Sequence, residues 1–172
     1  LNSEDKLVLQ FDLLGNNKET FYYTFIHCDK DWNKSDIFSS EYLNGFPENP
    51  IEDVRPSFNT TVSYFHYTLA FPNDNVSLLL SGNYIIIVYP YGDPDKPVLT
   101  QRFIVTEDRV KTDFRAYRPV LTAFNNTGQQ FDFTVKLHTA AVTDPLRNIY
   151  CTVLQNGRWN NAKTNLRPDF IG

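Results

Sequence analysis

The segment from His27 to Trp32 reads His-Cys-Asp-Lys-Asp-Trp and holds the densest group of reactive side chains in the chain. A cysteine beside a histidine is a pairing used in nucleophilic catalysis and in metal binding. The spacing argues against both, because neighbouring residues of a strand point to opposite faces and the segment ends a strand-forming run. We therefore expect His27 and Cys28 to lie in a packed end-of-strand element rather than in one site.

Asp29, Asp31 and Asn33 stand at the first, third and fifth positions of a calcium-loop pattern. Oxygen ligands at that spacing converge on a hard cation. The rest of the pattern fails, because Lys34 replaces the glycine of the sharp turn and Ser40 stands where the last glutamate is needed. We interpret the segment as a charged loop whose carboxylates accept backbone N–H groups, with an incidental cation site as the alternative.

The short motifs of common enzymes are missing elsewhere. The sequence contains no HExxH, GxSxG, P-loop or GxGxxG pattern, and His27, His66 and His138 lie on separate predicted strands. We expect His66, inside an aromatic run, to be a hydrogen-bonded sheet residue rather than a base. The sequence therefore predicts no enzymatic activity, no cofactor and no metal site.

Composition favours β-structure. Aromatic residues make up 15% of the 172 residues, with 14 Phe and 10 Tyr, and Met is absent. The two cysteines, Cys28 and Cys151, form no disulfide framework and are expected to be free, buried thiols. A net charge of -4 is too small to indicate nucleic-acid binding. No apolar run approaches the roughly 18 residues of a membrane span.

The charge is unevenly divided along the chain. Residues 1–108 contain seven Lys or Arg and 16 Asp or Glu, a net charge of -9, whereas residues 109–172 contain nine and four, a net charge of +5. The sign changes at Glu107–Arg109, where a new series of strands begins, so we expect a domain boundary between residues 108 and 109. The asymmetry is compatible with attraction between domains, with a polar partner or simply with solvated faces.

Strand patterns follow one another along the first domain. Residues 6–13 alternate apolar and polar side chains, and residues 20–28 are expected to pair with them as a hairpin across a short turn. The apolar run at residues 84–89 is the best candidate for a central strand. Further strands are expected at residues 61–71 and 98–106.

Residues 29–60 form a long excursion. We expect it to hold short strands or turns packed by Trp32, Ile37, Phe38, Tyr42, Leu43 and Phe46. The second domain is predicted to contain about four strands, including residues 131–137 and a hairpin around Asn156–Gly157. The predicted fold is all-β: an immunoglobulin-like β-sandwich over residues 1–108, followed over residues 109–172 by the start of a second β-domain.

A series of short motifs in fixed order spans residues 6–108. Its members are His27, Cys28, Asp29, Trp32, Ser35, Gly45, Ser57, Asn59, Thr60, Tyr64, Tyr67, Pro72, Ser81, Gly82, Asn83, Tyr84, Arg102 and Phe103. In order and spacing the series resembles the N-terminal domain of the type IX secretion system plug protein family. The segment after residue 108 resembles the start of that family's next β-domain.

The resemblance implies a periplasmic, outer-membrane-associated component of protein secretion. Such a plug closes the inner mouth of a large outer-membrane translocon β-barrel, which is the implied partner, when no cargo carrier is engaged. It also implies structural rather than catalytic roles for the motif residues. On that basis Gly45 and Gly82 allow tight turns, polar residues hold loop backbone, and Trp32 anchors the long excursion.

Two other functions are compatible with an aromatic-rich sandwich. One is carbohydrate binding in the cell envelope, with Tyr89, Tyr91, Trp32 or Trp159 as a stacking platform. The other is a structural spacer with no stable partner. An exposed, coplanar row of these rings would favour sugar binding, whereas buried rings would favour a protein partner.

Overall fold

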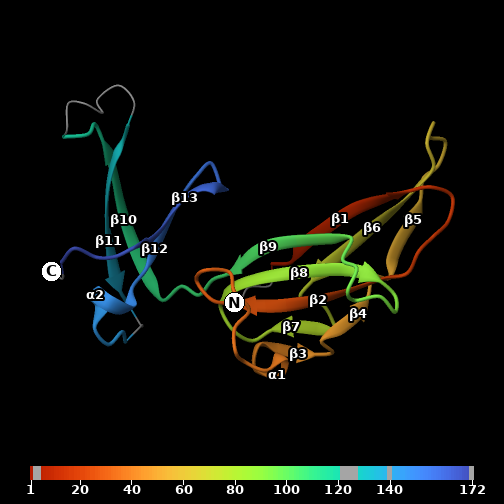
Figure 1. Cartoon of the computed structure of the whole chain (residues 1–172), viewed down its shortest axis with the longest axis horizontal. Coiled ribbons are helices and arrows are strands. Elements are labelled where there is room, and N and C mark those ends of the chain that lie inside the picture. The colour runs from red at the N-terminus through yellow and green to blue at the C-terminus, as the bar shows by residue number, and fades with distance from the viewer. Residues whose placement is uncertain (2–4, 121–127, 139–140, 171–172) are drawn as a thin grey trace. The chain divides into compact units, whose positions relative to one another are not determined.

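The computed structural model describes residues 1, 5–120, 128–138 and 141–170. It divides into two compact units, Leu1–Glu107 and Asp108–Gly172 (Figure 1). The elements of the first unit are β1 (Leu7–Leu14), β2 (Phe21–Cys28), α1 (Ser39–Tyr42), β3 (Leu43–Gly45), β4 (Glu48–Pro50), β5 (Asp53–Pro56), β6 (Tyr64–Phe71), β7 (Val76–Leu78), β8 (Gly82–Pro90) and β9 (Leu99–Val105). Those of the second unit are β10 (Val110–Tyr117), β11 (Gln130–Leu137), α2 (Pro145–Asn148), β12 (Cys151–Gln155) and β13 (Arg158–Leu166).

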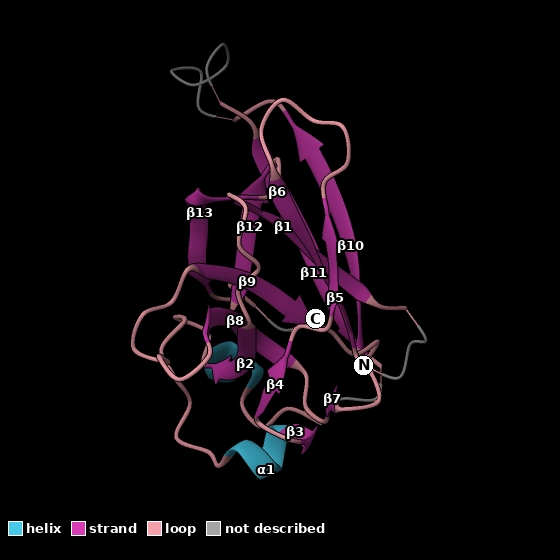
Figure 2. Ribbon diagram, turned by 90° about the vertical axis from the view of Figure 1, so that its right-hand side faces the viewer, coloured by secondary structure: helices cyan, strands magenta, loops and turns pink. Residues whose placement is uncertain are grey.

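The chain is all-β, and the first unit is built as a sandwich. One sheet has the strand order β4-β2-β8-β9 and another has the order β1-β6-β5, while β3 and β7 form a separate pair. The strands are drawn in magenta in Figure 2, with α1 in cyan. The predicted central strand is confirmed, because β8 lies between β2 and β9 in the four-stranded sheet. The immunoglobulin-like plan remains a prediction.

Aromatic rings from the two larger sheets fill the space between them. Phe21 of β2 meets Phe11 of β1 and Tyr67 of β6 at centroid distances of 5.6 and 5.1 Å. Phe25 of β2 meets Phe71 of β6 at 4.9 Å. Along β2 and the second half of β6, buried and largely aromatic residues alternate with partly exposed neighbours, which is the pattern of a sheet with one buried face. The core is therefore an aromatic layer between two sheets.

The predicted hairpin between the first two strands is wrong. β1 pairs with β6, and β2 pairs with β4 and β8, so the chain passes from one sheet to the other between Leu14 and Phe21. The physical reason is that both strands carry apolar faces that need cover. Stacking the two faces against each other buries both, whereas a hairpin would place both apolar faces on one sheet.

The long excursion contains short elements, as predicted, namely α1, β3, β4 and β5. Tyr42 and Leu43 are buried, and Ile37 packs against the core. Two expected packing residues are not buried, since Phe38 is 80% exposed and Phe46 is 71% exposed. Both lie in connecting segments at the ends of very short elements, which offer no second layer to cover a ring.

The second unit consists of two antiparallel pairs, β10 with β11 and β12 with β13. The predicted turn at Asn156–Gly157 is confirmed: both residues have positive φ, 55° and 69°, as a two-residue hairpin turn requires. None of the described residues of this unit is buried. Two-stranded sheets are marginal on their own.

Replacing Tyr67 with phenylalanine should cost about 1 kcal/mol of unfolding free energy. The Tyr67 hydroxyl donates to the Glu19 carbonyl at 2.7 Å and accepts from the Glu19 N–H at 3.2 Å. In the variant, the N–H and the carbonyl oxygen of Glu19 both lose the Tyr67 hydroxyl as a hydrogen-bond partner. Urea denaturation would measure the loss, with Tyr91→Phe as the control because the Tyr91 ring is 71% exposed. Equal stability of the two variants would contradict the prediction.

Candidate functional site

The densest set of motif residues gathers at one end of the four-stranded sheet. We call this group the His27 corner; it comprises His27, Asp29, Trp32, Ser35, Ser81, Gly82, Asn83, Tyr84 and Arg102. The strand register explains the gathering, because His27 of β2 pairs with Tyr84 of β8, which pairs with Phe103 of β9. Cys28 pairs with Asn83 in the next row. Three segments far apart in sequence are thereby brought into one place.

The imidazole of His27 is held from several sides. Its Nδ1 lies 2.8 Å from Ser35 Oγ, and its Nε2 lies 3.4 Å from the Ser81 carbonyl oxygen. The rings of Tyr84 and Tyr42 lie at centroid distances of 5.0 and 5.7 Å. A serine beside a histidine is also a nucleophile–base pairing. Here the two aromatic rings and the carbonyl fix the imidazole in the way expected of a structural residue.

Gly82 makes this packing possible. It has φ of +148°, and a Cβ at this position would lie 2.5 Å from His27 Nε2. A side chain would displace an imidazole that is already hydrogen-bonded to Ser35 and in edge-to-face contact with the Tyr84 ring. Glycine is therefore required by backbone conformation and by close approach together.

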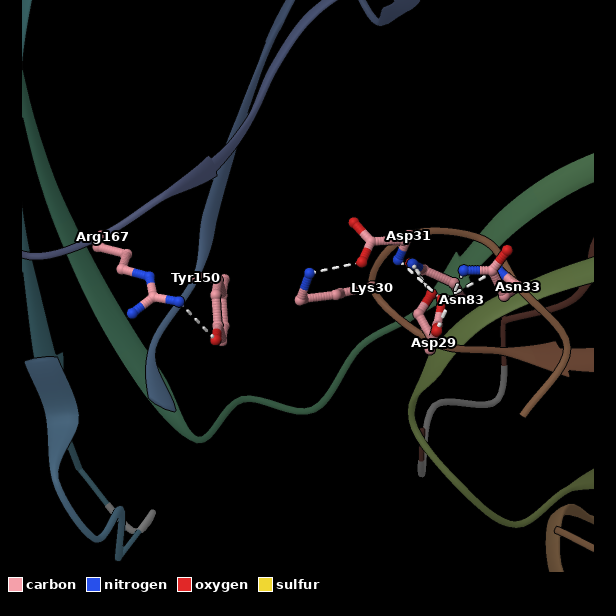
Figure 3. Close-up of polar contacts among 7 residues, drawn as sticks. All are labelled: Asp29, Lys30, Asp31, Asn33, Asn83, Tyr150 and Arg167. Carbon is pink, nitrogen blue, oxygen red and sulfur yellow. Dashed lines mark hydrogen bonds and ion pairs between the residues drawn. The ribbon is translucent and has the colours of Figure 1, made fainter. Parts of the chain in front are cut away.

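Asp29 organises the loop that follows β2, as the charged-loop interpretation predicts (Figure 3). Its Oδ1 accepts the backbone N–H groups of Asp31 and Asn33, each at 2.9 Å. These bonds, the one from Asn33 foremost, lower the pKa of the Asp29 carboxyl below its ordinary value. Asn83 Nδ2 donates to the Asp29 carbonyl oxygen at 2.9 Å and ties the loop to β8. The Asp29 carboxylate thus stabilises the loop by accepting hydrogen bonds from its backbone.

Trp32 lies half-buried within this loop and has an unusual positive φ of 67°. The guanidinium of Arg102, from β9, lies over its ring at 4.7 Å from the centroid. A cation over an indole face is attracted by the ring quadrupole. This contact joins the loop to the edge strand β9.

The two cysteines are free, as predicted. Cys28 is buried and Cys151 is half-buried. Burial raises the pKa of both thiols, with the Asp29 charge adding to the effect at Cys28. A raised pKa lowers the thiolate fraction at neutral pH, so neither cysteine has the environment of an activated nucleophile.

The other motif residues lie in separate places. Ser57, Asn59 and Thr60 belong to the connection between β5 and β6, and Tyr64 is the first residue of β6. Gly45 ends β3, and a Cβ there would lie 2.0 Å from the Asn75 carbonyl oxygen. Pro72 follows β6 through a cis peptide bond, and Tyr67 lies in the core. The motif therefore forms one extended corner and several turns, not one site.

The remaining described features lie outside the His27 corner. Among them, no group of three or more His, Cys, Asp or Glu side chains is arranged to hold a metal ion. His66 forms a cross-strand pair with Asp12 at 2.7 Å, the kind of sheet contact expected for it. A cavity of about 410 Å³ is lined by Ser39, Ser40, Leu43, Asn44, Gly45, Pro47 and Leu79, none of which is in the His27 corner. Within the described ranges, no helix is long and apolar enough to cross a membrane.

A family model described as the first domain of the type 9 secretion system plug protein matches residues 1–107. The chain belongs to this plug family. The match covers the whole first unit, including every motif residue on which the resemblance rests. The first unit is therefore a domain related to the type 9 secretion system plug.

A solved structure supports the same fold. A hypothetical protein from Parabacteroides merdae ATCC 43184 is 34% identical to the plug-family chain and superposes with a TM-score of 0.91. The match covers 99% of this chain and 43% of that protein, so the chain spans less than half of its solved relative. A search of curated proteins found no match.

Two residues that organise this plug-family domain were given no site role in the sequence analysis. Tyr42 lies against His27 and donates to the Phe25 carbonyl oxygen at 3.2 Å. Asn73 accepts the N–H groups of Asn75 and Val76, and its amide donates to the Tyr23 hydroxyl at 3.1 Å. The available signal for Asn73 was an asparagine directly after Phe-Pro, a common turn position.

Stability should fall at alkaline pH because of Tyr84. Burial is the largest cause, with the neighbouring Tyr42 next, in raising the pKa of Tyr84 from 10.0 to about 12. The unfolded chain therefore loses this proton before the folded chain does. The stabilisation is complete below about pH 10 and is lost as the pH rises through about 12.

Denaturation midpoints between about pH 9 and pH 12 would test this dependence. Tyr84→Phe should flatten the alkaline decline in part. Ile86→Val, a buried substitution without a titrating group, should lower the whole curve and leave its slope unchanged. An equal alkaline slope in Tyr84→Phe and the parent would contradict the prediction.

Proposed function

We propose that this chain is the first part of a periplasmic plug that closes the inner mouth of an outer-membrane translocon β-barrel in type 9 secretion. The match of residues 1–107 to the plug family carries the proposal. The function is binding rather than catalysis. In support, His27 is hydrogen-bonded to Ser35 and packed edge-to-face against Tyr84, and both thiols are poorly activated.

A plug needs a body that keeps its shape against the barrel. The aromatic layer supplies rigidity, because Phe25, Phe71 and Phe103 contact one another at centroid distances of 4.9 to 5.8 Å. Closely packed interiors resist compression. A plug must also leave when cargo arrives, so its affinity must depend on a limited contact surface.

The carbohydrate-binding alternative has weaker support. Of the four suggested platform rings, Tyr89 is only 3% exposed and Trp32 is half-buried beneath Arg102, whereas Tyr91 is 71% exposed. Sugar-stacking platforms need several exposed rings side by side. This arrangement favours a protein partner over a glycan.

Affinity purification from outer-membrane extracts tests the proposal. The natural protein would carry a tag in its own host, and co-eluting proteins would be identified by mass spectrometry. A very large β-barrel should co-elute with the tagged protein. Recovery of the bait alone, with the barrel present in the input, would contradict the plug function and favour a structural spacer.

A further inference from the structure

The connection between β5 and β6 carries the most exposed aromatic side chain among the described residues of the first unit. We call residues 57–63 the tip loop. Phe58 within it is 92% exposed and Val62 is 57% exposed. Leu14, at the adjoining end of β1, is 70% exposed and is placed beside the loop by its pairing with Tyr64. Figure 1 shows this loop projecting beyond the strands that it joins.

The backbone of the tip loop is fixed by a set of short-range bonds. Ser57 N–H donates to the Tyr64 carbonyl oxygen at 2.8 Å, and Tyr64 N–H donates to Ser57 Oγ at 3.0 Å. Thr60 Oγ1 donates to the Val62 carbonyl oxygen at 2.8 Å. Asn59 adopts the left-handed conformation, with φ of 56°, which asparagine tolerates well. The loop is therefore preorganised around an exposed phenylalanine.

This arrangement differs from the ordinary exposure of single apolar residues, which is common on protein surfaces. Three exposed apolar side chains lie at one tip, and bonds of the neighbouring polar residues fix the loop backbone that carries the phenylalanine. Aromatic anchors that need no reordering on binding carry much of the affinity of protein interfaces. The polar residues of the motif Ser57-Phe-Asn-Thr60 then have a purpose, which is to present Phe58.

We propose that the tip loop inserts Phe58 into an apolar pocket of the barrel partner, an inference that rests on the proposed function. A protein pocket is favoured over a lipid surface on two grounds. Residues 1–107 carry seven Lys or Arg and 15 Asp or Glu, a net charge of -8, which repels anionic headgroups. A fixed loop backbone strengthens binding to a protein pocket of matching shape. A fluid bilayer has no fixed shape, so it gains nothing from a preorganised loop.

The test compares Phe58→Ala with Phe38→Ala in the tagged natural protein. Phe38 is 80% exposed and lies before α1, so it provides the same chemical change away from the tip loop. Binding to the detergent-solubilised barrel is measured by titration. Phe58→Ala should weaken binding on the order of 30-fold, as removal of an interface anchor does, and Phe38→Ala should leave it within about two-fold.

A photocrosslinking residue at position 58 provides a second measurement. It should form an adduct with the barrel, and the same residue at position 38 should not. Unchanged titration together with no adduct at position 58, while the parent binds the barrel, would overturn this inference and leave the proposed function standing. Failure of the parent itself to bind the barrel would overturn both.

Vesicles made of zwitterionic and anionic lipids test the alternative, in which Phe58 inserts into a lipid bilayer rather than into a protein pocket. The parent and Phe58→Ala proteins should show equally little binding to these vesicles in the absence of the barrel. Vesicle binding that depends on Phe58 would overturn the pocket proposal in favour of membrane insertion. Because Phe58 is 92% exposed, its replacement should leave the denaturation midpoint unchanged, so a folding defect does not confuse the result.

Discussion

Replacing Phe25 with alanine is expected to lower the unfolding free energy of the first unit by about 4 kcal/mol. The Phe25 ring is only 2% exposed and lies at the centre of the aromatic layer. It contacts Tyr23, Phe71 and Phe103 at centroid distances of 5.6, 4.9 and 5.8 Å. Truncation removes these contacts and leaves a cavity that the surrounding sheets cannot close.

Urea denaturation followed by tryptophan fluorescence measures this loss. A Trp159→Phe background leaves Trp32 as the only tryptophan, and Trp32 lies in the first unit. Phe38→Ala is the matched control, because the same atoms are removed from a ring that is 80% exposed. Its effect should stay within about 0.5 kcal/mol. Similar losses in the two variants would show that the aromatic layer is not the main stabilising core.

Gly45→Ala should cost about 3 kcal/mol, since it combines two unfavourable effects. Gly45 has φ of +109°, a region that side-chain-bearing residues rarely adopt. The added Cβ would also lie 2.0 Å from the Asn75 carbonyl oxygen, a backbone atom of the turn before β7. Relief of that clash requires β3 and β7 to separate, which breaks their pairing.

Gly15→Ala separates the two effects. Gly15 also has a positive φ, +129°, but nothing lies within 4 Å of a Cβ placed there. It should therefore lose only the conformational part, about 1 kcal/mol. The difference between the two denaturation midpoints reports the clash alone. If both variants lose the same stability, the close approach of Gly45 to Asn75 does not limit the fold.

Local patterns in the sequence predicted the strands well. The apolar run at residues 84–89 became the interior strand β8, and the Asn-Gly pair at residues 156–157 became a hairpin turn. Both signals are local, since a strand's burial pattern and a turn's φ values depend on nearby residues. The charged loop at Asp29 was predictable for the same reason, because its bonds span four residues or fewer.

Partners distant in the chain were not predictable. The pairing of β1 with β6 depends on which apolar faces stack across the sandwich, and several pairings satisfy the alternation equally well. The His27 corner shows the same limit. The spacing of His27, Ser81 and Arg102 cannot reveal that three strands bring them together; only the register of β2, β8 and β9 does so.

Exposure was also hard to predict for short elements. Phe38, Phe46 and Phe58 have the same side chain as the core residue Phe25, yet all three are mostly exposed. A phenylalanine in an alternating strand is placed by the strand's period, whereas one in a connecting loop is placed by the loop's own bonds. The tip loop is an example, because bonds made by Ser57 and Thr60 fix the backbone on either side of the exposed Phe58.

The passage of the chain from one sheet to the other after β1 has a consequence for folding kinetics. Residues of β1 pair with residues 50 to 64 positions later, and residues of β2 pair in β8 with residues 55 to 69 positions later. Neither sheet can close until most of the first unit is available for pairing. Such high contact order predicts folding in milliseconds to seconds rather than microseconds. During that interval β1 and β2 expose unpaired edges and apolar faces, which promote aggregation.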